Sequence, residues 1–370
     1  MAASAVENQN LSSAQAKVMD IRISKNISYD NVHNILIRGT NWIGDVVMTL
    51  PALAAARKTF PKAKITVLVK PWVAAIFDLC PDVDEVFMFQ SPGEHEGVAG
   101  KMKLARELRQ KKFDMAILLQ NAIEAAIIAR WARIPIRIGY NSDARGWLLT
   151  HSVQRTKAIR RVHQIDYYVE MLKTAGFQSA GRDVHLRPNN DYHDLGDKLL
   201  DHFGLTDANV LCGIAPGAAY GPAKRWYPER YAAVAERLIS QHNAQVLMMG
   251  SEGDRASLDA VQEFAKNNLV NLAGKTNLKE AIALIAKCRL FISNDSGLMH
   301  VAGALGIPTV AIFGSTNPTT TSPVGEKSVI LYKDVPCSPC LKQECPTDFR
   351  CMDQISVEEV CEAARKLLDG

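Results

Sequence analysis

Short hydrophobic runs alternate with amphipathic stretches along the chain from residue 31 onwards. In the first half, the hydrophobic runs predict strands at 35–38, 65–69, 85–89 and 115–119. Apolar residues at helical spacing predict helices at 46–60, 72–79, 98–112 and 164–175. A short apolar run at 184–186 closes this half. The alternation is typical of a parallel sheet covered by helices on both faces.

The same alternation restarts after the polar segment RPNNDYHD at 187–194, which predicts a linker or hinge. Strands are expected at 210–215, 245–249, 290–293 and 309–313. Helices are expected at 228–242, 255–266, 278–288, 297–305 and 357–368. We therefore expect an α/β fold with two similar Rossmann-like halves that face a cleft. The first half would span residues 31–186 and the second 187–370.

Composition and charge narrow the class of protein. At 370 residues, with 47% hydrophobic and 22% charged residues, the chain suits a soluble globular protein of two domains. The net charge of +4 is small and gives no reason to expect a nucleic-acid partner. No apolar run reaches the 18 residues that a membrane span needs. Residues 1–30 are polar and lack the apolar core of a signal peptide, so we expect a mostly disordered extension on a cytoplasmic protein.

Four of the eight cysteines cluster near the C-terminus, at Cys337, Cys340, Cys345 and Cys351. Thiolates at short spacing can hold zinc, but structural zinc sites commonly use two CxxC pairs and only one is present. The spacing therefore favours a thiol-rich surface loop over a metal site, and we expect no bound metal.

The segment RGTNWIGDVVMTLPAL at 38–53 places Asp45 where a predicted strand turns into a helix. Ligands of α/β proteins bind at such turns. Aspartate is also a preferred helix cap. From the residues alone, Asp45 is either a helix cap or a catalytic acid.

Two loops of the second half follow predicted strands and carry candidate ligand-binding residues. In APGAAYGPAKRWYPERY at 215–231, Gly217 and Ala218 would let the backbone approach a ligand, and Lys224 adds positive charge. An ordinary solvated surface loop is the alternative. In GSEGDRA at 250–256, Glu252 or Asp254 could accept hydrogen bonds from a ribose diol, with Asp254 preferred. Helix capping by Asp254 is an equally good interpretation.

A third loop, SNDSGLMHVAGALG at 293–306, precedes a helix rich in small residues. Asp295 or Ser296 can cap this helix, Gly297 would let backbone amides approach a phosphate, and His300 falls in the first turn. A well-capped structural helix is the alternative. Neither GxGxxG nor GxxxxGK[ST] occurs, which argues against a nicotinamide dehydrogenase and a P-loop enzyme.

In combination, four segments resemble glycosyltransferase family nine, the lipopolysaccharide heptosyltransferases, and are most similar to those of type II. The segments are ILIRGTNWIGDVVMTLPAL, PGAAYGPAKRWYPERY, ISNDSGLMHVAGALGIPTVAIFGSTNP and the Cys-rich loop. The resemblance runs from about residue 33 to the end. It implies a GT-B architecture, with the donor bound by the second domain and the last helix, about 356–369, packed back on the first.

The resemblance also implies an activity. L-glycero-D-manno-heptose would move from ADP-heptose onto the inner-core heptose of the lipid A precursor (heptosyl-Kdo-lipid A), with inversion and without an obligatory metal or other cofactor. Alternatives are transfer to Kdo-lipid A, as by heptosyltransferase I, and a nucleotide-sugar epimerase of the same fold. A metal-binding interaction protein built around the Cys-rich loop is a non-enzymatic alternative.

Matched to the family motifs, individual residues acquire expected roles. Asp45 would be the general base and Lys224 would contact the donor phosphates. The diphosphate and sugar would be held by the loop of Asp295, Ser296 and Gly297. The remaining donor-binding candidates are Gly217, Ala218, Asp254 and His300. The turn around the base would be shaped by Thr40, Asn41 and Gly44, which are weaker acceptor-site candidates. Ala219 and Tyr220 stand where other family members carry hydroxyl residues, so contacts there would come from the backbone.

A basic stretch in the first half suits an anionic, membrane-embedded acceptor. Its members are Arg133, Arg137, Arg145, Arg155, Lys157, Arg160, Arg161 and His163. Arg133 and Arg137 are candidates for acceptor binding. Such residues attract anionic lipid by roughly 1 kcal/mol each near a membrane surface. We therefore expect peripheral contact with the cytoplasmic face of the inner membrane, and the alternative is a solvated helix face.

Overall fold

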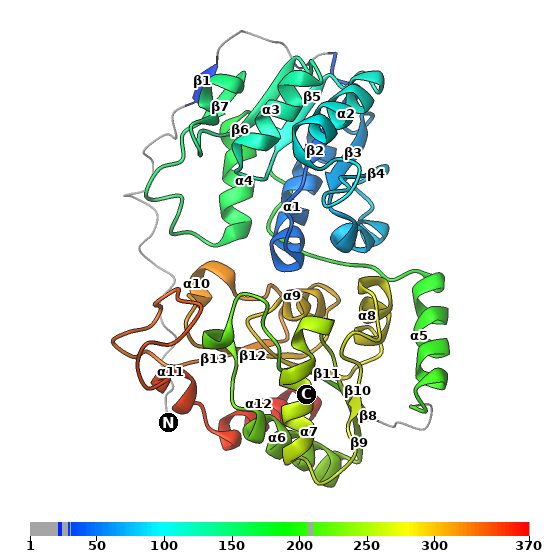
Figure 1. The fold of residues 1–370 in the computed structure, drawn as a ribbon, viewed down its shortest axis with the longest axis vertical. Coiled ribbons are helices and arrows are strands. Elements are labelled where there is room, and N and C mark those ends of the chain that lie inside the picture. The colour runs from blue at the N-terminus through cyan, green and yellow to red at the C-terminus, as the bar shows by residue number, and fades with distance from the viewer. Residues whose placement is uncertain (1–20, 24–28, 30, 206–209, 370) are drawn as a thin grey trace.

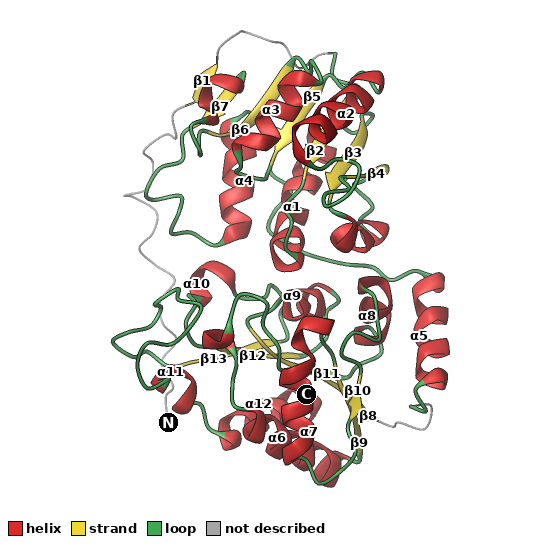
Figure 2. Cartoon of the chain, in the orientation of Figure 1, coloured by secondary structure: helices red, strands yellow, loops and turns green. Residues whose placement is uncertain are grey.

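The computed structural model describes residues 21–23, 29, 31–205 and 210–369. The chain forms two α/β domains placed one above the other along the longest axis of the molecule (Figure 1). Each domain is built on a single sheet with helices packed on it (Figure 2). Within the described ranges, no helix combines the length and the apolar character required to cross a bilayer.

The sheet of the first domain has seven strands in the order β1-β7-β6-β5-β2-β3-β4. The strands are β1 (Ile21–Ile23), β2 (Asn34–Arg38), β3 (Lys64–Val69), β4 (Glu85–Met88), β5 (Met115–Leu118), β6 (Ile136–Tyr140) and β7 (His151–Val153). Strands β2 to β7 are parallel, and β1 pairs antiparallel with β7 at the edge. Strand β1 corrects part of the expectation of disorder before residue 31. Residues 1–20, 24–28 and 30 lie outside the described residues.

Helices cover both faces of this sheet, as the alternating pattern predicts. They are α1 (Ile43–Thr59), the 3₁₀ helix η1 (Pro71–Leu79), α2 (Gly97–Gln110), α3 (Ile123–Trp131), the 3₁₀ helix η2 (Arg145–Leu148) and α4 (Gln164–Thr174). Helix α1 is buried along most of its length because small and apolar residues surround it on nearly every side. It packs against α4 of its own domain and against α9 of the second domain.

The predicted linker at 187–194 is shorter than expected. Helix α5 (Asn190–His202) begins inside it, where the side chain of Asn189 caps the helix by accepting from the Tyr192 N–H. Tyr192 then donates its hydroxyl to the carboxylate of Asp78 in the first domain at 3.2 Å. Because α5 also packs on α8 of the second domain, it joins the two domains.

The sheet of the second domain is parallel throughout, in the order β10-β9-β8-β11-β12-β13. Its strands are β8 (Val210–Ala215), β9 (Ala244–Met248), β10 (Val270–Asn271), β11 (Leu290–Asn294), β12 (Thr309–Phe313) and β13 (Ser328–Tyr332). The longer helices around it are α6 (Pro228–His242), α7 (Arg255–Phe264), α8 (Leu278–Ile285), α9 (Gly297–Ala304) and α12 (Val357–Asp369). Shorter helices are η3 (Pro222–Lys224), η4 (Glu252–Asp254), α10 (Pro318–Thr321) and α11 (Arg350–Asp353).

The last helix corrects one expectation taken from the resemblance. Helix α12 packs against α6 and strands β11, β12 and β13 of its own domain, and we expected it on the first domain. Its buried face, Val360, Ala363 and Ala364, belongs to the core of the second domain. An amphipathic helix buries its apolar face against the nearest complementary surface, and α6 and the second sheet provide that surface.

The domains touch closely where α1 meets α9. A Cβ atom on Gly44 would lie 2.6 Å from Cδ2 of His300, and one on Gly297 would lie 2.8 Å from Cβ of Ile43. Only glycine at both positions permits this approach. The loops after β2, β8 and β11 therefore face one another across the cleft, at the carboxyl ends of their strands.

Candidate active site

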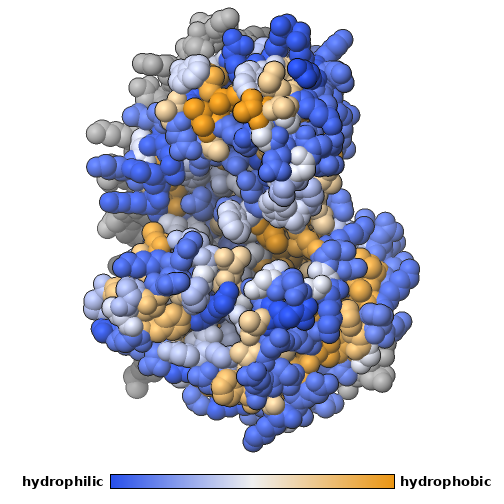
Figure 3. Space-filling model, in the orientation of Figure 1, coloured by the Kyte–Doolittle hydropathy of each residue, from blue (hydrophilic) through white to orange (hydrophobic). Residues whose placement is uncertain are grey.

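Two cavities open into the cleft between the domains. The tryptophan cavity, about 370 Å³, includes Trp42 and Trp72 on one wall and Gly217 and Asp254 on the other. The carboxylate cavity, about 320 Å³, includes Asp45, Lys224, Asp295 and His300. Residues bordering both are Trp42, Gly44, Ala219, Ser296 and Gly297. Seen as a surface, the molecule is hollowed between the domains, with apolar side chains inside the hollow (Figure 3). Both volumes suit small-molecule sites.

Asp45 lies in the first turn of α1 and is not the helix cap. The N-cap is Trp42, whose extended backbone starts the helix without a side-chain hydrogen bond. Within the described part of the chain, no hydrogen bond to the Asp45 carboxylate is found. Burial raises the pKa of Asp45 to about 6, opposed by the charge of Lys224 and reinforced by that of Asp295. A half-buried carboxylate with such a pKa, open to a cavity, can accept a proton near neutral pH.

Lys224 and Asp295 form an ion pair at the far wall of the carboxylate cavity. Lys224 Nζ donates to Asp295 Oδ2 at 2.6 Å, and the Thr316 hydroxyl donates to the same oxygen at 2.7 Å. Lys224 also lies over the ring of Tyr220, 5.1 Å from its centroid. Both members of the pair are largely buried. Asp295 therefore does not cap α9, because its carboxylate holds Lys224 in place.

Helix α9 is capped by Ser296. Its hydroxyl accepts from the Met299 N–H at 3.4 Å and contacts the Ser293 hydroxyl at 2.9 Å. The first turn of any helix presents N–H groups without intrahelical partners, and here that turn borders both cavities. His300 is buried against Gly44, and burial lowers the pKa of its imidazole to about 4. His300 is therefore a neutral polar wall of the carboxylate cavity near neutral pH.

Asp254 and Glu252, the two candidates for contact with a ribose, have different surroundings at the far wall of the tryptophan cavity. Asp254 accepts from the Ser251 N–H at 3.0 Å and from the Ser251 hydroxyl at 2.7 Å, in a capping box that starts η4. It also borders the cavity, whereas Glu252 pairs with Arg255 at 2.6 Å. Gly217 lies beside Asp254, where a Cβ atom would come within 2.3 Å of its Oδ1. Gly217 and Ala218 both line the cavity.

The acceptor-site candidates of the first domain are only partly brought to the cleft. Gly44 borders both cavities and Asn41 borders the tryptophan cavity, but Thr40 is buried and borders neither. Arg133 and Arg137 lie at the amino end of β6, at the sheet edge opposite the carboxyl ends that face the cleft. Arg137 donates its guanidinium to the carbonyls of Ile134 and Leu148. Neither arginine borders either of these two cavities, and their role in acceptor binding stays a prediction.

The basic stretch separates into a buried and an exposed part. Arg145 is completely buried and donates to the carbonyls of Tyr140 and Gln120, so it stabilises the first domain. His163 caps α4, and its second ring nitrogen lies 3.0 Å from the Ser322 carbonyl of the second domain. Four exposed members lie on the loop between β7 and α4: Arg155, Lys157, Arg160 and Arg161.

Several site residues were missed by inspection of the sequence. Thr316 lies after β12, and Trp42 and Trp72 follow β2 and β3. Asn294 accepts from the Trp226 N–H and the Tyr231 hydroxyl and donates to the Pro216 carbonyl, which aligns the loops after β8 and β11. Their common position after strands could have indicated the two tryptophans and Thr316, as it did Asp45.

The Cys-rich loop supports the loop that carries Lys224. The Tyr220 hydroxyl donates to the Leu341 carbonyl at 2.7 Å, and the Ala223 N–H donates to the Gln343 carbonyl at 2.9 Å. Of the cysteines, Cys337 is exposed and Cys351 is buried. Among the described residues, no group of three or more His, Cys, Asp or Glu side chains is arranged to hold a metal ion.

Comparison with known proteins identifies relatives over nearly the whole described fold. Residues 101–349 match the model of glycosyltransferase family 9 (heptosyltransferase). Lipopolysaccharide heptosyltransferase 2 of Salmonella typhimurium is 32% identical over 306 residues, covering 80% of this chain and 87% of that protein. The solved structure of Escherichia coli ADP-heptose LPS heptosyltransferase II aligns with a TM-score of 0.77 at 27% identity, covering 90% of this chain and 98% of that one. A family 9 glycosyltransferase from Veillonella parvula aligns with a TM-score of 0.79 at 26% identity, covering 92% and 98%.

Proposed function

The chain belongs to glycosyltransferase family 9, and on that premise we propose that it transfers L-glycero-D-manno-heptose from ADP-heptose to the first heptose of the inner-core lipopolysaccharide precursor. The protein is a GT-B heptosyltransferase of the lipopolysaccharide core. Relatives named heptosyltransferase 2 support the type II acceptor. Kdo-lipid A, the acceptor of heptosyltransferase I, is the alternative.

The observation that carries this proposal is the placement of Asp45 opposite Lys224 in one cavity. Asp45 comes from the first domain and lacks a hydrogen-bonded partner among the described residues, whereas Lys224 comes from the second and is held by Asp295. An inverting displacement needs a base on the acceptor side and positive charge on the leaving-group side. The two sides of the cavity provide these two groups.

In the proposed reaction, Asp45 takes the proton of the acceptor hydroxyl as its oxygen attacks the anomeric carbon of the heptose. The bond from that carbon to the β-phosphate oxygen breaks, and ADP leaves with the electron pair. Lys224 and the first turn of α9 stabilise the negative charge of the diphosphate, since cations and helix N-termini both favour anions. Asp254 accepts from the ribose hydroxyls in the tryptophan cavity, and His300 lies beside the sugar.

Contact with the membrane surface forms part of the proposal because the acceptor is a lipid. The exposed Arg155, Lys157, Arg160 and Arg161 on the loop between β7 and α4 support it. They would attract the anionic cytoplasmic face of the inner membrane by roughly 1 kcal/mol each. Cosedimentation with anionic vesicles would measure this contact. We expect the cosedimented fraction to fall with added salt and in the variant Arg160→Ala/Arg161→Ala.

An acceptor panel tests the proposed function. ADP release from ADP-heptose is measured with lipid A precursors that carry Kdo alone, one heptose or two heptoses. We expect turnover with the one-heptose acceptor and at most a few per cent of that rate with the others. Faster turnover with the Kdo-only acceptor would assign the type I activity, and ADP release without any acceptor would contradict transfer.

A further inference from the structure

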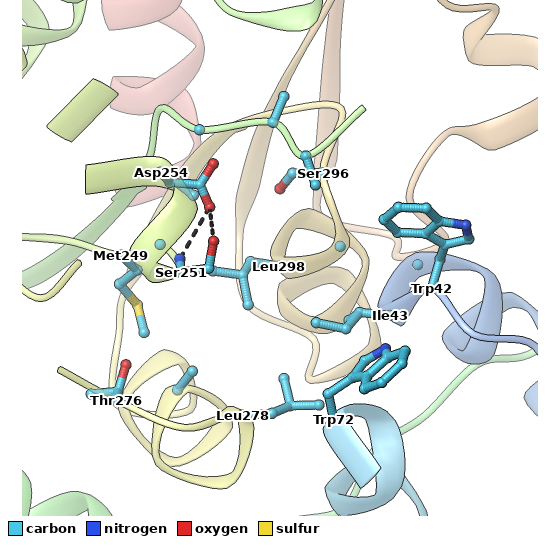
Figure 4. A pocket seen from close by; sticks show the side chains of 18 of the residues that line it. Trp42, Ile43, Trp72, Met249, Ser251, Asp254, Thr276, Leu278, Ser296 and Leu298 are labelled. Carbon is cyan, nitrogen blue, oxygen red and sulfur yellow. Dashed lines mark hydrogen bonds between the residues drawn. The ribbon is translucent and has the colours of Figure 1, made fainter. Parts of the chain in front are cut away.

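Two large aromatic side chains of the first domain are exposed inside the cleft. Trp42 is 63% exposed and Trp72 is 49% exposed, although both line the tryptophan cavity. Figure 4 shows the two indoles on one side of this cavity, with Ser251, Asp254 and Thr276 of the second domain on the other. Two exposed aromatic side chains that line one cavity form an apolar surface typical of a ligand-binding site.

Local contacts hold Trp72 ready for such a partner. Its indole N–H donates to the Asn41 carbonyl at 2.8 Å, which satisfies its polar atom and ties η1 to the loop between β2 and α1. That loop leads directly into the turn with Asp45. Trp42, the N-cap residue of α1, borders both cavities and so lies at the junction between them. Neither indole stacks on another ring within the described part of the chain.

The shape and lining of the tryptophan cavity suit the nucleoside end of a donor. Its apolar lining includes Met249, Leu278 and Leu298, and its polar groups include Ser251 and Asp254. A flat base needs apolar or aromatic faces, and a ribose needs acceptors for its hydroxyls. Base–aromatic stacking provides affinity without reading the edge of the base.

We propose that Trp42 and Trp72 close on the nucleoside end of the donor, with the base stacked on an indole, so that the first domain helps to hold the nucleotide. This inference rests on the proposed function, which places ADP in the tryptophan cavity. Donor binding then buries the two exposed indoles, and one of them, Trp42, is the N-cap residue of the helix that carries Asp45.

Affinity measurements test the stacking. We expect Trp42→Ala/Trp72→Ala to raise the Kd for ADP at least ~5-fold, because stacking contributes about 1–3 kcal/mol per base. Pyrophosphate has no base to stack. Its Kd should therefore change less than about 2-fold, which corresponds to a small free-energy difference. The matched control is Trp147→Ala, since Trp147 is 78% exposed and borders neither cavity. An unchanged Kd for ADP, or an equal loss for pyrophosphate, would overturn the inference.

Tryptophan fluorescence gives a second readout that does not depend on a truncated side chain. Saturating ADP should quench or blue-shift the emission of the wild type and of Trp147→Phe. The change should be largely lost in Trp42→Phe/Trp72→Phe, which keeps aromatic rings and the fold. A full signal in that double variant would contradict the inference. If the wild type bound UDP in preference to ADP, the proposed donor would be wrong, while the same losses measured with UDP would still support the indole contact.

Discussion

The two carboxylates of the carboxylate cavity come from different domains and have opposite surroundings. Asp295 of the second domain accepts from Lys224 and from the Thr316 hydroxyl, so its charge is compensated. Asp45 of the first domain has no hydrogen-bonded partner in the described part of the chain, and burial raises its pKa to about 6. Two acids in one site can have different roles when their environments give them different pKa values. Asp45 is free to accept a proton, and Asp295 is committed to holding a cation.

The same contrast extends to the two walls of the cleft. The second domain presents groups already fixed by hydrogen bonds, including the capped α9 and the Ser251–Asp254 capping box. The first domain presents groups without such partners, including Asp45 and the exposed Trp42. A wall that is fixed in advance suits the donor, while a wall with free groups suits a step that starts when both substrates are present.

The largest expected effect comes from removing the basicity of Asp45, and with it the difference between the two carboxylates of the cavity. Asp45→Asn keeps the shape of the side chain but cannot accept a proton near neutral pH. We expect turnover to fall at least ~10²-fold, the lower end for loss of a general base. The Kd for ADP should stay near that of the wild type, and the Tm should not fall, because a partly buried charge is removed. Steady-state kinetics with calorimetry measure all three.

Asp295→Asn is the matched control for this variant. It should weaken ADP binding and lower the Tm, because it loosens Lys224, which is the reverse of the pattern at Asp45. Retention of more than about a tenth of wild-type turnover by Asp45→Asn would rule out the base role, since that loss is far below the expected range.

The next effect concerns the cation of the second domain. Lys224→Ala should raise the Kd for ADP by about 10- to 100-fold, because charge-assisted hydrogen bonds contribute about 1.5–3 kcal/mol. Lys224→Arg should keep part of the affinity. Since the charge of Lys224 lowers the pKa of Asp45, its removal should also move the acid limb of the pH–rate profile to higher pH. Calorimetry with an unchanged ADP affinity would remove Lys224 from the donor site.

The pH dependence of turnover measures the surroundings of Asp45 directly. The pKa of about 6 means that Asp45 is protonated below that pH and cannot act as a base. The rate should therefore fall about tenfold per pH unit below pH 6 and level off above it. Because the pKa of Asp45 in the folded protein lies above the ordinary aspartate value of 3.8, ionisation of Asp45 costs stability as pH rises from about 4 to 6. Between about pH 4 and 6, the Tm of Asp45→Asn should therefore rise relative to that of the wild type. An acid limb of the pH–rate profile centred near pH 4 would contradict the effect of burial on the pKa of Asp45.

The smallest effect concerns the contact that brings the two walls together. Gly44→Ala places a Cβ atom 2.6 Å from the His300 ring, so the domains must shift apart slightly. We expect turnover to fall by up to about 10-fold, because catalytic groups are sensitive to small displacements. The Kd for ADP should stay within about 2-fold, a difference below 1 kcal/mol. Gly253→Ala is the control, since its nearest atom is the Ser251 hydroxyl at 3.6 Å. Equal turnover of the two variants would show that this contact does not set the geometry.

Much of the fold could be predicted from the sequence, because the longer strands and helices carry their periodicity locally. The predicted helix at 228–242 matches α6, and the predicted strand at 309–313 matches β12. Strands β7 and β10 were missed, because two or three residues carry too little pattern to stand out. Strands β6 and β13 were also missed, although they are as long as β12. Helix α5 was missed because its capping residue, Asn189, lies in a polar segment typical of a linker.

For the candidate site, the sequence determined which turns are candidates for chemistry, and the tertiary structure decided the surroundings of each side chain there. Asp45, Lys224 and Asp295 were all identified from loops that follow strands, because strand and helix signals are local. Whether Asp45 is a cap or a base depends on burial and on charges brought by another domain, about 180 to 250 residues away in the chain. The same holds for Arg145, which belongs to a basic stretch in the sequence and to a buried carbonyl cluster in the fold. Solvation and charge proximity are properties of space, so only the packed chain sets them.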